Sequence, residues 1–117
     1  MRMNITARRF KLNEDLREFT EKEVGRLSRY YEGIVDIEVI LSWEKFYRLA
    51  EIKIGVHGTI LTAQERSEEM HKAIRLTVDK LERQLVKYKD KLHAFGHEKA
   101  VEKTAELDFL VKPEKEA

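Results

Sequence analysis

The stretch from Glu69 to Leu92 constrains the fold most, because it carries two unlike faces at the spacing of an α-helix. Its mainly apolar residues recur at intervals of three and four: Met70, Ile74, Thr77, Leu81, Leu85, Tyr88 and Leu92. At roughly 100° per residue they form one stripe, which must be buried. A second stripe, about 80° wide and roughly opposite, is a cation row: Lys80, Arg83, Lys87 and Lys91. The sequence therefore predicts a helix that walls a core and also presents positive charge.

The distribution of charge favours a polyanion as the partner of this helix. The whole chain has a net charge of +1, but residues 96–117 hold six acids against four lysines, a net charge of −2, which leaves +3 for residues 1–95. A mildly basic domain with its cations gathered on one helix suits a nucleic acid. The plainer alternative is a solvated, lysine-rich helix face, and composition alone favours that alternative.

The segment before residue 34 predicts one strand and one helix. Arg2 to Arg8 alternates apolar and polar residues, which indicates a strand. Asn13 can cap the following helix, and Gly33 is expected to supply the left-handed residue that ends it. The buried stripe of this helix is expected to comprise Leu16, Phe19, Val24, Leu27 and Tyr31.

From Ile34 the hydrophobic period changes to two, which predicts three antiparallel strands. A turn at Lys45 to Tyr47 and a tight connection at His57-Gly58 separate the three runs. The third run, from Thr59 to Glu65, leads to the long helix, which should begin near Ser67. The inward residues of the first two runs are expected to be Val35, Ile37, Val39, Leu41 and Trp43, then Ala50, Ile52, Ile54 and Val56.

These elements predict an α+β fold of order βαβββα, a four-stranded sheet with two helices packed on one face. The helical crossover should make the first two strands parallel and right-handed. The other sheet face, with Glu38, Glu51 and Lys53, should stay in water. We expect one domain over residues 1–95 and a flexible, mildly acidic C-terminal extension over residues 96–117, whose apolar segment at residues 107–111 could dock on a partner or on the domain itself.

Several classes of function lack their usual residues. The chain has no cysteine, so a disulfide framework, a thiol nucleophile and a zinc thiolate site are excluded. No apolar run is long enough to act as a secretory signal or to span a bilayer, so we expect a cytoplasmic protein. His93 and His97 are four residues apart, but Gly96 lies between them and no carboxylate completes a metal site. We therefore expect no metal, no cofactor, no small-molecule substrate and no enzymatic activity.

Short segments spread along the chain carry a resemblance to a known family. These segments are Asn4-Ile5-Thr6, Leu16-Arg17-Glu18-Phe19, the Val39 to Lys45 run, Met70, Ala73-Ile74, Asp79-Lys80-Leu81, Arg83-Gln84-Leu85 and Lys89-Asp90-Lys91-Leu92. In their joint spacing, over about residues 1 to 93, they resemble the bacterial ribosome hibernation-promoting factors. That family includes the ribosome-associated inhibitor also called protein Y.

The resemblance implies a domain that binds the small ribosomal subunit in the decoding region, where mRNA and tRNAs would otherwise lie. Family members stop translation in stationary phase or stress, and their basic helix surfaces contact rRNA. Carried onto this chain, the resemblance implies rRNA contacts by Lys80, Arg83, Lys87 and Lys91, with Lys89 beside them and Arg26 on the first helix. We expect the isolated chain to be monomeric and to bind no membrane.

Some positions depart from the family pattern, and two other classes of protein stay open. His71, Tyr88 and Glu65 stand where other residue types are frequent. Because Tyr88 falls on the apolar stripe, we expect it to pack in the core, with its hydroxyl exposed, rather than to stack on a base.

A general double-stranded RNA-binding module also has helices on one side of a small sheet. In a protein-interaction module, the cation row would meet an acidic protein.

Overall fold

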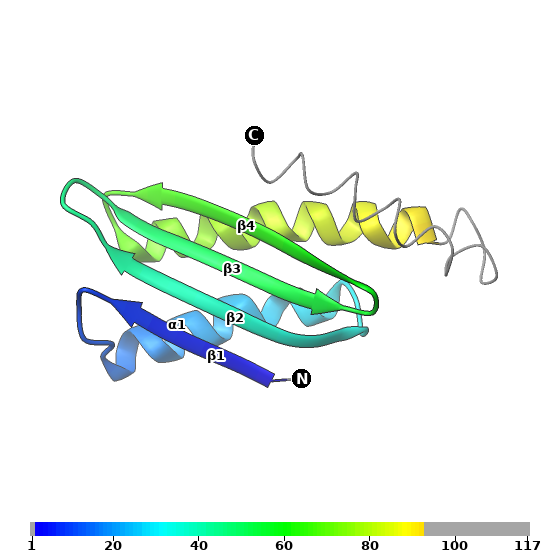
Figure 1. The fold of residues 1–117 in the computed structure, drawn as a ribbon, viewed down its shortest axis with the longest axis horizontal. Coiled ribbons are helices and arrows are strands. Elements are labelled where there is room, and N and C mark those ends of the chain that lie inside the picture. The colour runs from blue at the N-terminus through cyan, green and yellow to red at the C-terminus, as the bar shows by residue number, and fades with distance from the viewer. Residues whose placement is uncertain (1, 93–117) are drawn as a thin grey trace.

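The computed structural model describes residues 2–92. Within them, four strands form one sheet in the order β1-β2-β3-β4 (Figure 1). β1 pairs with β2 in parallel, whereas the β2–β3 and β3–β4 pairs are antiparallel. The predictions made for His93, Gly96, His97 and the extension lie outside the described residues. The strands are β1 (Arg2–Arg8), β2 (Ile34–Trp43), β3 (Arg48–Val56) and β4 (Thr59–Ser67).

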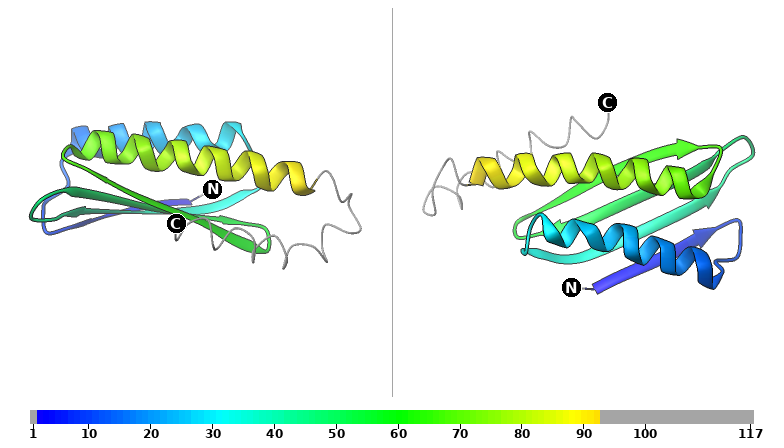
Figure 2. Two further views of the ribbon diagram at one scale, coloured as in Figure 1. Left: turned by 90° about the horizontal axis from the view of Figure 1, so that it is seen from above. Right: turned by 180° about the vertical axis from the view of Figure 1, so that it is seen from behind.

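Two helical segments cover one face of this sheet. The crossover from β1 to β2 contains α1 (Glu14–Gly25) and a short 3-10 helix, η1 (Arg26–Arg29). A long helix, residues 70–92, follows β4. Figure 2 shows α1 and the long helix side by side on the same side of the sheet. The predicted α+β fold of order βαβββα, with both helices on one face, is confirmed.

The core lies between this sheet face and the two helices. Alternate side chains of β2, β3 and β4, such as Val39, Ile52 and Leu61, are fully buried there. Leu81 and Leu85 of the long helix are also 0% exposed. The predicted apolar stripe is confirmed, since its other members are buried and Leu92 is half-buried. Dense packing along the whole stripe fixes the rotation of the long helix about its axis.

The first helix begins as predicted but ends differently. Asn13 Oδ1 accepts a hydrogen bond of 2.8 Å from the Leu16 backbone N–H, so it caps α1. The α-helical part ends at Gly25, and the chain continues as η1, in which a three-residue repeat keeps Leu27 on the buried face with Val24. Gly33 does not have a positive φ, so the prediction of a left-handed stop there is wrong.

Glycine at position 33 answers a steric need instead. A Cβ atom at that position would lie 2.5 to 2.7 Å from atoms of the Tyr31 ring. The Tyr31 ring in turn packs edge-on against Tyr88, with 5.6 Å between the ring centroids. The glycine therefore permits a close approach of the η1–β2 connection to the core.

Two further predictions, for Val35 of β2 and for the start of the long helix, also need correction. The β2–β3 pairing shifts register between Ile34 and Asp36, a β-bulge that turns Val35 outward, where it is 59% exposed. The expected inward position of Val35 is therefore wrong, and Ile34 is buried instead. β4 continues to Ser67, and the long helix begins at Met70 rather than near Ser67, because the last strand residues still pair with β3.

Tyr88 joins the long helix to the β3–β4 turn. Its side chain is 2% exposed, which confirms core packing, but its hydroxyl donates a 3.1 Å hydrogen bond to the backbone carbonyl of His57. The expectation of an exposed hydroxyl is therefore wrong. Burial, with smaller contributions from Tyr31, raises the pKa of Tyr88 to about 12.

The raised pKa predicts a loss of stability at alkaline pH. Because the unfolded chain ionises Tyr88 near its ordinary pKa of about 10, its contribution to stability is fully present below that pH and is lost as pH rises through about 12. Between these pH values, wild type should lose roughly 1–3 kcal/mol more than Tyr88→Phe. Urea denaturation at a series of pH values measures the difference. Parallel curves for the two proteins would contradict the assignment.

Candidate nucleic-acid interface

The cation row begins beside β4, where Lys80 lies near Glu65, and continues along the solvent-facing side of the long helix, where Arg83 and Lys87 line a hollow with Tyr30. Arg83 and Lys87 are exposed, whereas Lys80 and Lys91 are half-buried. Gln84 donates a 3.1 Å hydrogen bond from Nε2 to the Thr62 carbonyl of β4. Because the opposite side of the helix is packed in the core, the row is held on a rigid support.

Lys80 is partly neutralised within the domain. Its Nζ lies 3.5 Å from Glu65 Oε2, and Glu65 belongs to β4. A half-buried pair at this distance contributes little to stability, but it offsets one of the four charges of the row. Arg83 and Lys87 are the two members of the row that are exposed to solvent.

Arg26 lies in η1, directly after α1, and is paired with acids of the domain. Its guanidinium lies 2.8 Å from Glu23 and 2.8 Å from Glu82, and 3.8 Å from Asp79. Although desolvation lowers the pKa of Arg26, the hydrogen bonds and charges of Glu82 and Glu23 together raise it. Arg26 thus ties η1 to the long helix and neutralises acids of that helix, and its predicted contact with RNA stays a prediction.

Lys89 does not lie beside the cation row. It lies on the other flank of the helix, where it lines a hollow of about 290 Å³ with η1 and the connection after it, including Arg29 and Glu32. Two exposed cations earlier in the helix, Lys72 and Arg75, were not predicted as site residues. Lys72 was recognisable from its spacing, because it lies eleven residues before Arg83 and so falls about 20° from it around the helix.

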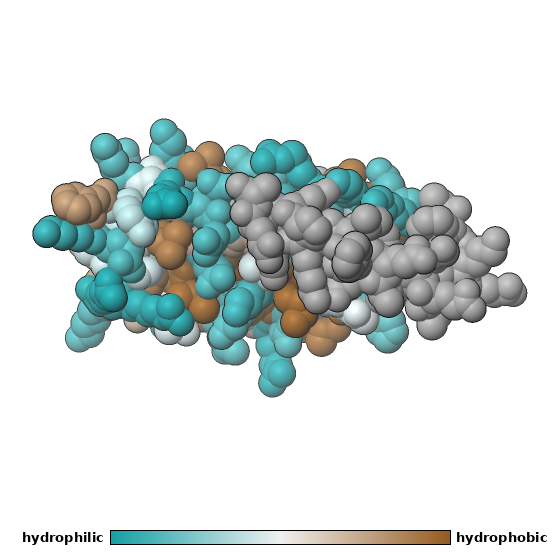
Figure 3. Space-filling view, turned by 45° about the horizontal axis from the view of Figure 1, so that its top comes forward, coloured by the Kyte–Doolittle hydropathy of each residue, from teal (hydrophilic) through white to brown (hydrophobic). Residues whose placement is uncertain are grey.

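The long helix is strongly basic as a whole. Residues 70–92 contain seven lysines and arginines and three acids, a net charge of +4. Arg83 and Lys87 line a shallow hollow of about 550 Å³ together with Tyr30 and the acids Asp79, Glu82 and Asp90. Figure 3 shows a surface that is mostly hydrophilic over the described residues on the side it views.

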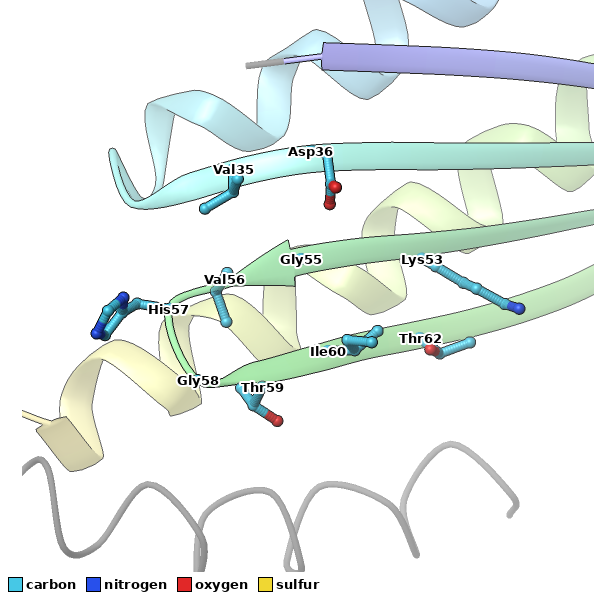
Figure 4. Close-up of a pocket in the computed structure, with 10 residues that line it drawn as sticks. All are labelled: Val35, Asp36, Lys53, Gly55, Val56, His57, Gly58, Thr59, Ile60 and Thr62. Carbon is cyan, nitrogen blue, oxygen red and sulfur yellow. The ribbon is translucent and has the colours of Figure 1, made fainter.

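The opposite face of the sheet holds a different kind of hollow. It has a volume of about 790 Å³ and lies near the β3–β4 turn (Figure 4). Asp36 and Lys53 come to it from neighbouring strands, and a Cβ atom at Gly55 would collide with the Asp36 carboxylate. With one acid, one lysine and the exposed apolar residues Val35 and Ile60, this hollow is less suited to a polyanion than the long helix.

The side chains of the cation row are suited to binding an anion such as a phosphate. Arg83 can meet a phosphate with two parallel N–H donors, whereas the lysines act as point charges. Within residues 2–92 no group of three or more His, Asp and Glu side chains is arranged to hold a metal ion. Over the same residues, no helix has the length and apolar character needed to cross a membrane.

Comparison with known proteins gives consistent results at the level of sequence. Residues 3–93 match the family described as sigma 54 modulation protein / S30EA ribosomal protein. The ribosome hibernation promoting factor of Azotobacter vinelandii is 35% identical over 91 residues, which are 78% of this chain and 85% of that protein. The protein of the same name in Escherichia coli K12 is 36% identical over 92 residues, 79% of this chain and 97% of that protein.

Solved structures have the same fold. A ribosomal subunit interface protein from Coxiella burnetii superposes with a TM-score of 0.73 at 31% identity, covering 77% of this chain and 99% of that one. The N-terminal domain of Thermus thermophilus Protein Y gives a TM-score of 0.70 at 28% identity, covering 75% and 99%.

Proposed function

Because this chain belongs to the sigma 54 modulation protein / S30EA ribosomal protein family, we propose that it is a ribosome hibernation factor that inhibits translation. In this proposal it binds rRNA of the small subunit in the decoding region, through the cation row, and occludes the mRNA and tRNA sites under stress or in stationary phase. The names of its relatives, ribosome hibernation promoting factor and ribosomal subunit interface protein, support this role. The protein would then act in the cytoplasm, as a monomer.

The observation that carries the proposal is the presentation of Arg83 and Lys87 on a helix whose other side is fully packed. Folded rRNA offers dense phosphates in a fixed arrangement, which a rigid row of cations can meet with little ordering beyond its head groups. Inhibition by occlusion requires neither bond making nor bond breaking. A folded domain that fills the path of mRNA and tRNA is sufficient.

Two measurements test the proposal. In a translation system of purified components, the protein in excess should inhibit synthesis, and in pelleting assays it should sediment with small subunits. If the cation row neutralises four phosphates, the logarithm of the association constant should fall with the logarithm of salt concentration with a slope of about −3 or steeper. Undiminished translation at a large excess of protein would contradict the proposal.

A duplex RNA control separates this function from that of a general double-stranded RNA-binding module. Such a module recognises any A-form duplex by its shape. The proposed factor should bind assembled subunits far more tightly than a free RNA hairpin under the same salt conditions. Equal affinity for both would favour the general module instead.

A further inference from the structure

The hairpin that joins β2 and β3 carries an aromatic and cationic cluster that the cation row does not explain. Its loop closes through a 2.9 Å hydrogen bond from the Glu44 N–H to the Tyr47 carbonyl. Arg48 donates from Nη1 to the carbonyls of Glu44 and Tyr47, at 3.0 and 3.3 Å. The hairpin is therefore a braced structure rather than a loose loop.

Trp43 contacts the braced hairpin through only part of its ring surface. The Arg48 guanidinium lies 3.7 Å from the centre of its ring, and the Phe10 ring lies at 5.6 Å. Trp43 nevertheless remains 47% exposed. Its position next to the loop makes it a fixed aromatic surface beside the tip of the hairpin.

Phe46, at the tip, is the most exposed large apolar side chain among the described residues, at 81%. Lys45 Nζ lies 5.3 Å from the centre of its ring. Figure 3 shows a separate hydrophobic projection at the end of the molecule where Figure 1 places this hairpin. An aromatic ring held in water in this way gains little from the fold and is available to a ligand.

The charges around these rings are mainly positive. Arg66 of β4 lies 4.9 Å from the centre of the Tyr47 ring. Glu44 is the acid of the loop, and it is paired with Arg9 at 2.7 Å and also accepts a hydrogen bond from Ser42. Arg9 has a positive φ of 68° and remains 70% exposed beyond this pair. Three cations, Lys45, Arg48 and Arg66, therefore lie within 5.3 Å of the centres of these rings, and Arg9 lies beside them in its pair with Glu44.

We propose that the β2–β3 hairpin binds unpaired RNA bases, with one base stacked on Phe46 and the adjacent phosphates held by Lys45, Arg9 and Arg66. Aromatic rings surrounded by cations are the common means of holding single-stranded nucleic acid, because every base has a face that stacks and every linkage carries a phosphate. A duplex keeps its bases stacked on each other and offers none to Phe46. The ligand is therefore a single-stranded segment.

This site lies at the other end of the long helix from most of the cation row. Arg48 pairs with Ser67, three residues before the long helix begins at Met70. Lys87 and Lys91 lie about 17 and 21 residues further on, roughly 25 to 30 Å at the helical rise. The inference rests on the proposed function only for the source of the RNA, an exposed strand of the ribosomal complex.

The chain contains one tryptophan, so its intrinsic fluorescence reports on this hairpin. Titration of the full chain with a short single-stranded RNA at low salt should quench or shift the Trp43 emission, with a Kd below about 1 mM. The same strand annealed to its complement should produce little change. The absence of a response to single strands, or an equal response to the duplex, would overturn the proposal.

Variants at position 46 separate stacking from general hydrophobic contact. Phe46→Leu keeps an apolar side chain but removes the ring, and it should weaken binding of labelled single-stranded RNA by about 5- to 100-fold, as expected for one stacked base. Phe46→Tyr should bind like wild type. Ile60→Ser, which removes an exposed apolar residue from the outer sheet face, is the matched control and should also bind like wild type. Equal affinity of Phe46→Leu and wild type would overturn the proposal.

Three further outcomes have distinct meanings. A stronger Trp43 response to vesicles of anionic phospholipid than to RNA would assign the hairpin to a membrane surface and overturn the proposal. If wild type fails to sediment with small subunits but still stacks single-stranded RNA, the ribosomal function fails and the hairpin site stands. If subunit binding is intact but the Trp43 response is absent, the hairpin site alone fails.

Discussion

The double variant Arg83→Glu/Lys87→Glu is expected to bind small ribosomal subunits roughly 10²- to 10⁴-fold more weakly than wild type, because each lost hydrogen bond to a charged group is worth about 1.5–3 kcal/mol. Both side chains are exposed on a helix whose opposite side is buried. The substitutions should therefore leave the fold intact. Exposed substitutions usually change the free energy of unfolding by less than about 0.5 kcal/mol each.

Lys80 is left out of this variant for a structural reason. Its Nζ lies 3.5 Å from Glu65, so a glutamate at position 80 would place two carboxylates together and confound binding with stability. The matched control is Arg2→Glu/Arg8→Glu, which changes the net charge equally on exposed residues of β1, away from the helices. It should retain most of the affinity.

Pelleting assays at several salt concentrations give a second readout. Loss of two phosphate contacts should make the salt slope shallower by about 1.5 to 2 units in the double variant. The control should keep the wild-type slope. Co-sedimentation of the double variant at wild-type affinity would remove the cation row from the proposed interface.

The sequence alone was sufficient for the order of elements and for the buried stripe of the long helix. Its apolar period of three and four extends over more than six turns, and the alternation in β3 is unbroken, so the local signals agree with the tertiary packing. Asn13 was recognisable as a cap for the same reason, since capping depends on residues close in sequence. Where the local signals in the sequence agree with the tertiary packing, the hydrophobic pattern is sufficient to predict the structure.

Tertiary contacts decide the features that the sequence pattern does not indicate. The bulge that turns Val35 outward depends on how β2 and β3 pair, and it changes the faces of Ile34 and Val35 while the later residues Ile37, Val39 and Leu41 keep the predicted face. The pairing of Arg26 with Glu82 joins residues 56 positions apart. No local pattern indicates that an apparently free arginine is committed in this way.

The exposure of Trp43 differs from the prediction for a related reason. Trp43 was assigned to the buried face of β2 from its position in the alternation, and it does follow Leu41 on that side of the strand. Trp43 is the last residue of β2, however, and the helices do not cover this end of the sheet. Trp43 therefore remains 47% exposed. Period identifies the face of a strand, but not how far along that face the core extends.

Leu81→Ala is expected to cost roughly 2–5 kcal/mol of unfolding free energy, the largest effect on stability that we predict from a single substitution. Leu81 is 0% exposed and belongs to the core cluster between the long helix and the sheet. Truncation removes buried methyl groups and leaves a cavity that the surrounding strands can close only in part. Because domains of this size are stable by only about 5–15 kcal/mol, the variant should unfold at much lower urea concentration.

Leu76→Ala is the matched control, since it changes the same residue type on the same helix at a position that is 37% exposed. It should cost less than about 1 kcal/mol. Leu81 lies behind the cation row and does not contact a ligand, so Leu81→Ala should bind small subunits with the wild-type dissociation constant at temperatures where urea denaturation finds it folded. Reduced affinity of a fully folded Leu81→Ala would mean that the core shapes the binding surface directly. Similar costs for the two variants would mean that the long helix is not packed as described.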